Sequence, residues 1–386
     1  MTIFLFCVMK YFYRLLISLS GCLIFLLLHS GLGSLPSLAA EKVTVRYGLF
    51  ERSIPVADIR NYGENQKASA DLQSFLDYLS AKEKQKFQDA LQVKMSLDIV
   101  ALDKLINTGM GKQILSFASQ AIARRDQASI QALRSAIIIG AKSPEGLGLV
   151  SFLAAYPSNQ LVIDVSKISK LVGMANSSSG SADAPPKDNV SSSPFGKIAL
   201  QYQILAAQNK QFSGCLFGDS VSAELGNTLG NGTFNFGLNG LSTISLLEQL
   251  KSLIPTKVTC EKAIIAVGGN DAWYGISDEL FSKNLQEAIA LVRTMGNKEI
   301  FLIPAFYSTV AASSDPTISA PNSRVEQINA LINKVAEIEK VPVAATEVAP
   351  LYENNVLKEN LSSDGDHLNS EGLKIYRQAL LQLLQK

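Results

Sequence analysis

Short apolar segments alternate with amphipathic segments along the second half of the chain, and this rhythm restricts the fold more than any other feature. Helical periodicity covers 278–295 and 324–338, and a last helix begins at Ser370. Strands that alternate with helices form a parallel sheet covered on both faces. Ligands of such sheets bind at the carboxyl ends of the strands. Buried strands are predicted at 214–217, 262–267, 299–303 and 341–345.

The first half of the chain has the pattern of a separate, mostly helical domain over residues 41–172. A weak alternation over 42–54 predicts one short strand, with one face formed by Val43, Val45, Tyr47 and Leu49. Helical spacing follows, because apolar residues recur three and four positions apart, as on the buried stripe of an amphipathic helix. The clearest stripes are Leu72, Phe75, Leu76 and Leu79; Leu102, Leu105 and Ile106; Ile114 and Phe117; and Ile130, Leu133 and Ile137.

A polar tract separates the two halves. Residues 173–195 are rich in Ser, Pro, Asp and Gly. Such a tract cannot bury enough apolar surface to offset the entropy lost on ordering, so we predict a flexible linker. The α/β domain is then expected to cover residues 196–386.

The N-terminus has the three parts of an export signal over residues 1–40. Lys10 and Arg14 supply positive charge, residues 15–28 are almost wholly apolar, and small residues at 34–40 offer a cleavage site. The alternative is an uncleaved membrane anchor, although the apolar run is short for a transmembrane helix. Both interpretations predict an exported protein, in the periplasm or the extracellular space.

Charge and cysteine content exclude several classes of function. Only two of the 35 Lys and Arg residues precede residue 41, so the remaining basic residues nearly balance the 34 acidic ones. No basic run is interleaved with aromatic residues, so nucleic acid is not an expected partner. No Cys/His cluster has the spacing of a zinc site, so no metal is expected. Cys215 and Cys260 remain after the predicted signal, and both a buried free thiol and a disulfide stay open for them.

The tripeptide Gly218-Asp219-Ser220 follows the first predicted strand directly. A helix can begin at Val221, which would leave Ser220 at a helix N-terminus. The helix dipole stabilises developing negative charge at that position, as a nucleophilic serine requires. Gly-Asp-Ser is also an ordinary turn and N-cap composition, so the tripeptide alone does not distinguish a nucleophile from a turn.

The histidine count narrows the search for a general base. The chain has two histidines, and His29 lies in the predicted signal, so a mature serine hydrolase with a histidine base would use His367. Asp364 lies three residues earlier, where its carboxylate can fold back onto the imidazole and hold its tautomer. The competing interpretation is a polar turn before the last helix, capped by Asn369 or Ser370.

Two glycine-bearing loops can supply hydrogen-bond donors for an oxyanion. Residues 235–240 can present the backbone N–H of Gly240. The segment 268–271, Gly-Gly-Asn-Asp, follows the second predicted strand, and the side-chain amide of Asn270 can point into the crevice at the strand ends. Taken separately, each segment is an ordinary glycine-rich loop.

Four segments of this half, taken in order, resemble the motif blocks of the SGNH (GDSL-like) hydrolase superfamily: Gly218-Asp-Ser220, Gly240, Gly268-Gly-Asn-Asp271 and Asp364-Gly-Asp-His367. The resemblance covers about residues 212–386. It implies a flavodoxin-like α/β/α three-layer sandwich with a parallel sheet, and ester hydrolysis without a cofactor. The implied catalytic residues are Ser220, Asp364 and His367. The implied oxyanion hole consists of the backbone N–H groups of Ser220 and Gly240 and the side chain of Asn270.

The N-terminal domain is similar to the small helical domain of unknown function that precedes some secreted bacterial α/β-hydrolases. The segment 47–50, Tyr-Gly-Leu-Phe, and the turn 143–146, Ser-Pro-Glu-Gly, carry this likeness. It assigns no activity.

The function expected from these residues is that of an exported serine esterase, which hydrolyses an acyl ester or transfers its acyl group to a sugar hydroxyl. The expected partner is a small-molecule, lipid or glycan ester. The alternative is a binding protein, in which the helical domain contacts the cell envelope and the hydrolase fold is an inactive scaffold. A scaffold has no need to keep the full set of Ser220, Asn270, Asp364 and His367, which favours the enzyme.

Overall fold

The computed structural model describes residues 40–47, 50–77, 79–122, 129–164, 188–230, 232–296 and 299–385. The predicted signal peptide, apart from Ala40, lies outside the described residues, and so does the predicted linker from 173 to 187. The chain divides into two compact units, Met1–Ser179 and Gly180–Lys386, and each is described by itself.

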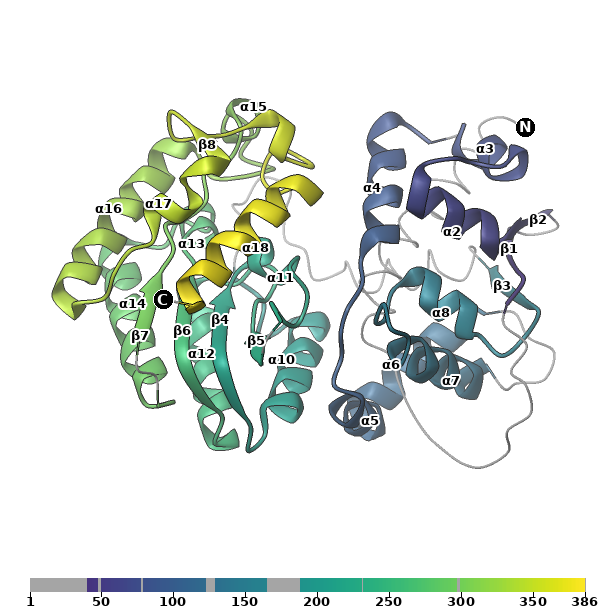
Figure 1. Cartoon of the computed structure of the whole chain (residues 1–386), viewed down its shortest axis with the longest axis horizontal. Coiled ribbons are helices and arrows are strands. Elements are labelled where there is room, and N and C mark those ends of the chain that lie inside the picture. Colours follow the sequence, from purple (N-terminus) through teal and green to yellow (C-terminus); the bar gives the residue numbers. More distant parts are fainter. Residues whose placement is uncertain are drawn as a thin grey trace. The chain divides into compact units, whose positions relative to one another are not determined.

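The N-terminal unit is mostly helical, as predicted, and also contains a three-stranded sheet (Figure 1). β1 (Lys42–Tyr47) pairs antiparallel with β2 (Phe50–Pro55) and parallel with β3 (Gln160–Asp164). The alternation over 42–54 predicts one strand, whereas the chain reverses inside that segment and forms a hairpin. The helices are α2 (Val56–Asn65), α3 (Ala70–Leu76), α4 (Ala81–Gln92), α5 (Ile99–Asn107), α6 (Gly109–Gln120), α7 (Ser129–Ala141) and α8 (Leu149–Ala155).

Most of the predicted apolar stripes form the core of this unit. The stripes that begin at Leu72 and Leu102 are buried at every position. Phe117 and Ile130 differ from the prediction, because their side chains are 38% and 37% exposed. In α6 the buried positions include Leu115, and Phe117 lies only two residues further, which on a helix is the opposite side.

A four-stranded parallel sheet forms the centre of the C-terminal unit, in the order β5-β4-β6-β7. Counted along the chain this is the 2-1-3-4 order of flavodoxin-like folds. The segment predicted as a strand at 341–345 contributes one parallel bridge, between Leu302 and Val343, before a short helix begins. The strands are β4 (Gln211–Gly218), β5 (Thr233–Asn235), β6 (Thr259–Ala266) and β7 (Glu299–Leu302).

Helices cover both faces of this sheet, so the predicted three-layer α/β/α architecture is confirmed (Figure 1). On one face, α17 (Ala345–Val348) and α18 (Ser370–Gln385) pack on alternate strand residues, among them Leu216, Ile264 and Phe301. The other layer contains α12 (Thr243–Leu253) and α14 (Asp278–Arg293), with α10 (Pro194–Ala207) beside α12 and α16 (Asn322–Glu339) beside α14. The shorter elements are α11 (Ser220–Ala223), α13 (Gly269–Trp273), α15 (Val310–Ser313), β8 (Tyr352–Glu353) and β9 (Val356–Leu357).

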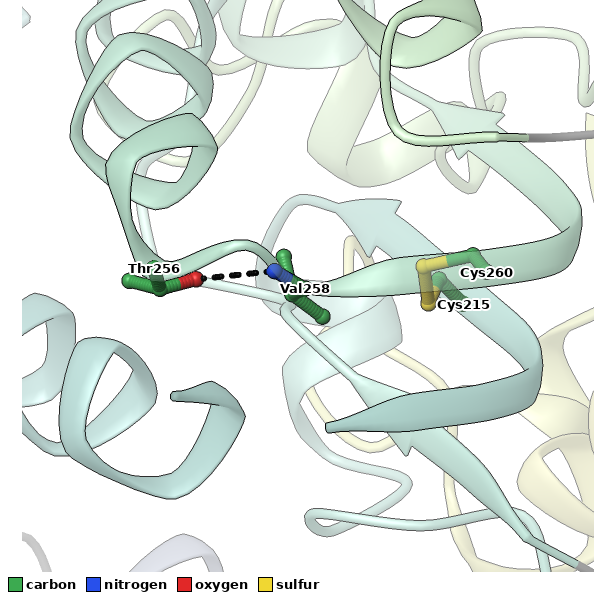
Figure 2. The surroundings of a disulfide bond; sticks show 4 residues. All are labelled: Cys215, Thr256, Val258 and Cys260. Carbon is green, nitrogen blue, oxygen red and sulfur yellow. Dashed lines mark hydrogen bonds between the residues drawn. A yellow bond between two sulfur atoms is a disulfide. The ribbon is translucent and has the colours of Figure 1, made fainter. Parts of the chain in front are cut away.

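Cys215 in β4 and Cys260 in β6 form a disulfide bond between two central strands (Figure 2). Both residues are buried. Val258 leads into β6 from a turn, where its backbone N–H donates to Thr256 Oγ1 at 3.3 Å (Figure 2). Of the two states that the sequence left open for these cysteines, the structure contains the disulfide.

The predicted linker is ordered at its C-terminal end, which corrects the boundary at residue 195. The backbone N–H of Ser193 donates to Asn189 O at 2.8 Å, and this turn leads into α10. Ser193 caps α10 by accepting the backbone N–H of Gly196 at 3.0 Å, and Val190 is buried. Composition hides this, because helix caps and turns use the same Ser, Asp, Asn and Pro residues as flexible tracts.

Candidate active site

Ser220 is the first residue of α11, immediately beyond the carboxyl end of β4. The turn needs glycine at position 218, because a Cβ atom there would lie 2.1 Å from Ser222 Oγ. Ser222 Oγ in turn lies 3.1 Å from the Tyr376 hydroxyl, which fixes α11 to α18. The strand, the turn and α18 therefore set the position of the Ser220 side chain together.

His367 and Asp364 lie on a tight loop that precedes α18. The backbone of the loop closes on itself, because Ser363 N–H donates to His367 O at 3.0 Å. Gly365 has a φ of +100°, in a region that residues with a Cβ atom rarely adopt. This reversal brings the carboxylate of Asp364 back toward the residue three positions later.

Ser220, His367 and Asp364 form a continuous chain of polar contacts. His367 Nε2 lies 2.9 Å from Ser220 Oγ, and His367 Nδ1 lies 3.1 Å from Asp364 Oδ2. Asp364 Oδ1 also accepts the backbone N–H of His367 at 2.8 Å, so one carboxylate holds both the backbone and the ring. With the Nδ1 proton directed at Asp364, the Nε2 lone pair is free to accept the proton of the serine hydroxyl.

Electrostatic interactions between His367 and Asp364 stabilise the charged form of each side chain. Burial alone would raise the pKa of Asp364, but the hydrogen bonds and charge of His367 outweigh it and hold that pKa well below its usual value. Burial alone would lower the pKa of His367. The hydrogen bond to Asp364 and the charges of Glu224, Asp364 and Asp366 outweigh that effect and raise the pKa of the imidazole above its usual value.

Two further carboxyl groups flank the same histidine. Burial raises the pKa of Asp366 to about 6, and its backbone N–H donates to Asp364 Oδ1 at 3.0 Å. Asp219 is the N-cap of α11, with Oδ1 accepting the backbone N–H of Val221 at 3.2 Å. Burial and the charge of Asp366 raise the pKa of Asp219 to about 7.

The Gly240 loop lies beside α13, the short helix that carries Asn270. Asn270 Nδ2 donates to Leu241 O at 3.2 Å, so this side chain contacts the residue directly after Gly240. The Tyr274 hydroxyl donates to Gly240 O at 2.9 Å. Gly240 has a φ of +77°, and a Cβ atom there would lie 3.0 Å from that hydroxyl, so the loop requires glycine.

Asp271, the last residue of the Gly-Gly-Asn-Asp segment, is buried and anchors α13. Its carboxylate accepts the backbone N–H of Thr243 at 3.0 Å and the Thr243 hydroxyl at 2.5 Å. Burial raises the pKa of Asp271 to about 7, although the hydrogen bonds from Thr243 oppose this. The residue ties α13, which carries Asn270, to the N-terminus of α12.

The structure thus brings Ser220, His367 and Asp364 into direct contact and places Asn270 of α13 beside the Gly240 loop. Sequence reasoning missed the structural roles of Asp271, Thr243 and Tyr274, which hold the loop and α13 in place. The sequence shows that Asp271 follows Asn270 directly, but it does not show that Asp271 binds Thr243, 28 residues earlier.

Among the described residues, no group of His, Cys, Asp and Glu side chains could hold a metal ion. The described helices include none with the length and apolarity to cross a membrane.

The chain matches two family models, one in each unit. Residues 212–375 match the GDSL-like Lipase/Acylhydrolase family. Residues 39–164 match the family described as Alpha/beta hydrolase of unknown function (DUF1400). The C-terminal unit therefore has the sequence pattern and the parallel α/β sheet of a GDSL-like acylhydrolase, a class of hydrolases that act on esters, and the resemblances predicted for both halves are confirmed.

Solved structures of the same class are similar to part of the chain. A GDSL-like lipase from Bacteroides thetaiotaomicron VPI-5482 has 18% sequence identity and a TM-score of 0.39, and the match covers 46% of this chain and 88% of that one. The lipase/acylhydrolase from Enterococcus faecalis has 20% identity and a TM-score of 0.36, with 46% and 95% covered. Because these TM-scores lie below 0.5, the fold is assigned from the strand order and not from these likenesses. None of the curated proteins matches the chain.

Proposed function

We propose that this protein is an exported serine esterase with Ser220 as nucleophile, His367 as general base and Asp364 as the acid that orients the base. The observation that carries the proposal is the 2.9 Å separation of His367 Nε2 from Ser220 Oγ, with Asp364 on the opposite ring nitrogen. A nucleophile, a base and an orienting acid in hydrogen-bond reach are the parts that acyl transfer requires.

The reaction proceeds through an acyl-enzyme. Ser220 Oγ attacks the ester carbonyl carbon while His367 Nε2 accepts the hydroxyl proton. His367 then returns this proton to the departing alcohol, and the acyl group stays on Ser220. Water, activated by the same imidazole, attacks the acyl carbonyl and releases the carboxylic acid. A sugar hydroxyl in place of water would give transfer instead of hydrolysis.

The negative charge that develops on the carbonyl oxygen needs preorganised donors. We assign the backbone N–H groups of Ser220 and Gly240 and the side-chain amide of Asn270 to this role. The position of Ser220 supports this, because the first N–H groups of a helix lack partners within the helix. The contact of Asn270 with Leu241 supports it too, because it places the amide beside Gly240.

Export is part of the proposal. The positively charged, apolar and small-residue parts of segment 1–40 have the order of a signal peptide. The disulfide between Cys215 and Cys260 supports an oxidising compartment, because structural disulfides are rare where thiols are kept reduced. The exported protein would act in the periplasm or the extracellular space on a small-molecule, lipid or glycan ester.

Hydrolysis of a short aryl ester by purified protein tests the proposal. Wild type should release the phenol, and Ser220→Ala should reduce the rate to the uncatalysed background. Ser252→Ala is the matched control, because it removes a half-buried serine of α12 whose hydroxyl donates to Glu248 O. A second assay uses esters of graded acyl length. If wild type hydrolyses none of them faster than the uncatalysed background, the alternative is favoured: a binding protein with an inactive hydrolase fold.

A further inference from the structure

The segment that enters the C-terminal unit, beginning at Asp188, is packed against the Gly240 loop. Asp188 Oδ2 accepts hydrogen bonds from the hydroxyls of Ser242 and Ser245, the latter at 2.7 Å. The same oxygen accepts the backbone N–H of Ser245 at 3.2 Å. Asp188 Oδ1 accepts the backbone N–H of Val190 at 3.1 Å, which turns the chain toward the loop.

Three consecutive residues of the loop are each held by a different side chain. Gly240 O accepts from Tyr274, and Leu241 O accepts from Asn270 Nδ2. Ser242, the next residue, is bound through its hydroxyl to Asp188. The first two contacts come from the C-cap residue of α13 and from α13 itself, and the third comes from a segment more than 50 residues earlier.

Tyr274 and Val190 leave no room for a side chain at Gly240. A Cβ atom on Gly240 would lie 3.0 Å from the Tyr274 hydroxyl and 3.5 Å from Val190 Cγ2. Val190 is 6% exposed, so it is packed and not a loose contact. The turn that Asp188 initiates therefore packs against Gly240, close to the Tyr274 hydroxyl.

Charge reinforces this arrangement. Ser242 is the N-cap of α12, and the carboxylate of Asp188 accepts the backbone N–H of Ser245 in the first turn of that helix. A negative charge at a helix N-terminus is stabilised by the helix dipole. Asp188 thus binds the last loop residue and the first helical turn at once, which leaves the loop little freedom to shift.

We propose that Asp188 is a positioning residue for catalysis, which acts through Ser242 and Ser245 to hold the Gly240 backbone N–H at the oxyanion. This inference rests on the proposed function and adds a residue that lies in the predicted linker. The hydrogen bonds of Asp188 go to Val190, Ser242 and Ser245, so any effect on the reaction passes through these residues. Its loss should weaken transition-state stabilisation and leave ground-state binding almost unchanged, because the oxyanion forms only during the reaction.

The test uses the full-length protein with Asp188→Asn and, as a milder second variant, Ser245→Ala, which keeps the carboxylate. We expect Asp188→Asn to lower kcat roughly tenfold to a hundredfold with KM within about twofold, somewhat less than the loss of a whole oxyanion donor. Affinity for an alkyl boronic acid, whose tetrahedral adduct on serine imitates the transition state, should fall by the same factor. Ser245→Ala should show both effects at reduced size.

Asp278→Asn is the matched control, because it makes the same substitution in the first turn of α14, where Asp278 pairs with Arg324 at 2.7 Å. It should leave kcat and boronic acid affinity unchanged. The inference is overturned if Asp188→Asn folds and keeps the wild-type kcat, or if its kcat falls while its affinity for the boronic acid is unchanged. If Asp188→Asn does not fold, the same two measurements on Ser245→Ala decide the question. Ser220→Ala, assayed alongside, separates the two proposals: persistent activity there overturns the proposed function, whatever Asp188 does.

Discussion

His367 Nδ1 lies 3.1 Å from Asp364 Oδ2, while the other oxygen of that carboxylate accepts the backbone N–H groups of His367 and Asp366 at 2.8 and 3.0 Å. One carboxylate therefore fixes the loop and the imidazole together. Asp366 is adjacent to the histidine in sequence, but it acts on the ring through its charge. The geometry therefore favours Asp364 over Asp366 as the orienting acid of the proposed site.

Asp364→Asn should accordingly reduce activity far more than Asp366→Asn. The amide removes the charge that stabilises the imidazolium and favours the wrong tautomer, a change that costs up to ~10⁴-fold in kcat where it has been measured in triads. We expect a loss of about a hundredfold or more for Asp364→Asn and less than about tenfold for Asp366→Asn. Comparison of kcat/KM for the two variants checks this, and a larger loss at Asp366 would mean that the acid is misassigned.

The pH dependence of kcat/KM should report the state of His367. Only the neutral imidazole can accept the serine proton, so activity rises as pH increases through the pKa of His367. Because the Asp364 hydrogen bond and neighbouring charges raise this pKa, the midpoint should lie above the usual value of about 6.5. Asp364→Asn removes the largest of the raising influences, so its residual activity should have a midpoint at lower pH. An unchanged midpoint would argue against the coupling.

Asn270→Ala should lower kcat by about a hundredfold or more, as expected for the loss of one oxyanion donor. The fold should persist, because Asp271 still anchors α13 through Thr243. Steady-state kinetics over a range of substrate concentrations separate the parameters. A change confined to KM would assign Asn270 to substrate binding alone.

Thr243→Val should destabilise the protein without altering the catalytic groups. It removes the 2.5 Å hydrogen bond to Asp271 and leaves a buried carboxyl group with one fewer donor. The expected loss is about 1–3 kcal/mol of unfolding free energy. Urea denaturation measures this, and wild-type stability would show that Asp271 is satisfied by its remaining bonds.

Replacement of Cys215 and Cys260 together by Ala should also lower stability. The disulfide joins residues 45 positions apart, and its removal frees that loop in the unfolded chain, which costs about 2–4 kcal/mol. Denaturation of oxidised and reduced wild type provides the comparison. If the double variant is as stable as oxidised wild type, the disulfide makes no net contribution.

The sequence predicted the parts of the fold that repeat a pattern. Alternating strands and helices predicted the parallel sheet and its two helical layers, and the first and last motif segments contained Ser220, Asp364 and His367, which lie in contact in the structure. β5 was missed because three residues carry no periodicity. The strand predicted at 341–345 became one bridge, because α17 begins at Ala345.

Hydrogen bonds between residues far apart in the sequence could not be predicted either. The contact of Asp188 with Ser242 joins a polar tract to a distant helix cap, and nothing in the local composition distinguishes a capping aspartate from one in a flexible segment. Asp271 and Thr243 illustrate the same point, since each reads as an ordinary loop residue until the fold brings them together. Roles that depend on a second residue far along the chain need the structure.

The central claim is that Ser220 is the nucleophile, and covalent labelling with a fluorophosphonate followed by mass spectrometry of the digested protein tests it most directly. The phosphonyl group should appear on the peptide that contains Ser220, with release of fluoride, and labelling should be lost in Ser220→Ala. His367→Ala should slow labelling strongly, because the 2.9 Å contact that activates the hydroxyl is gone. An adduct on another residue of the wild type, or labelling that persists in Ser220→Ala, would contradict the account.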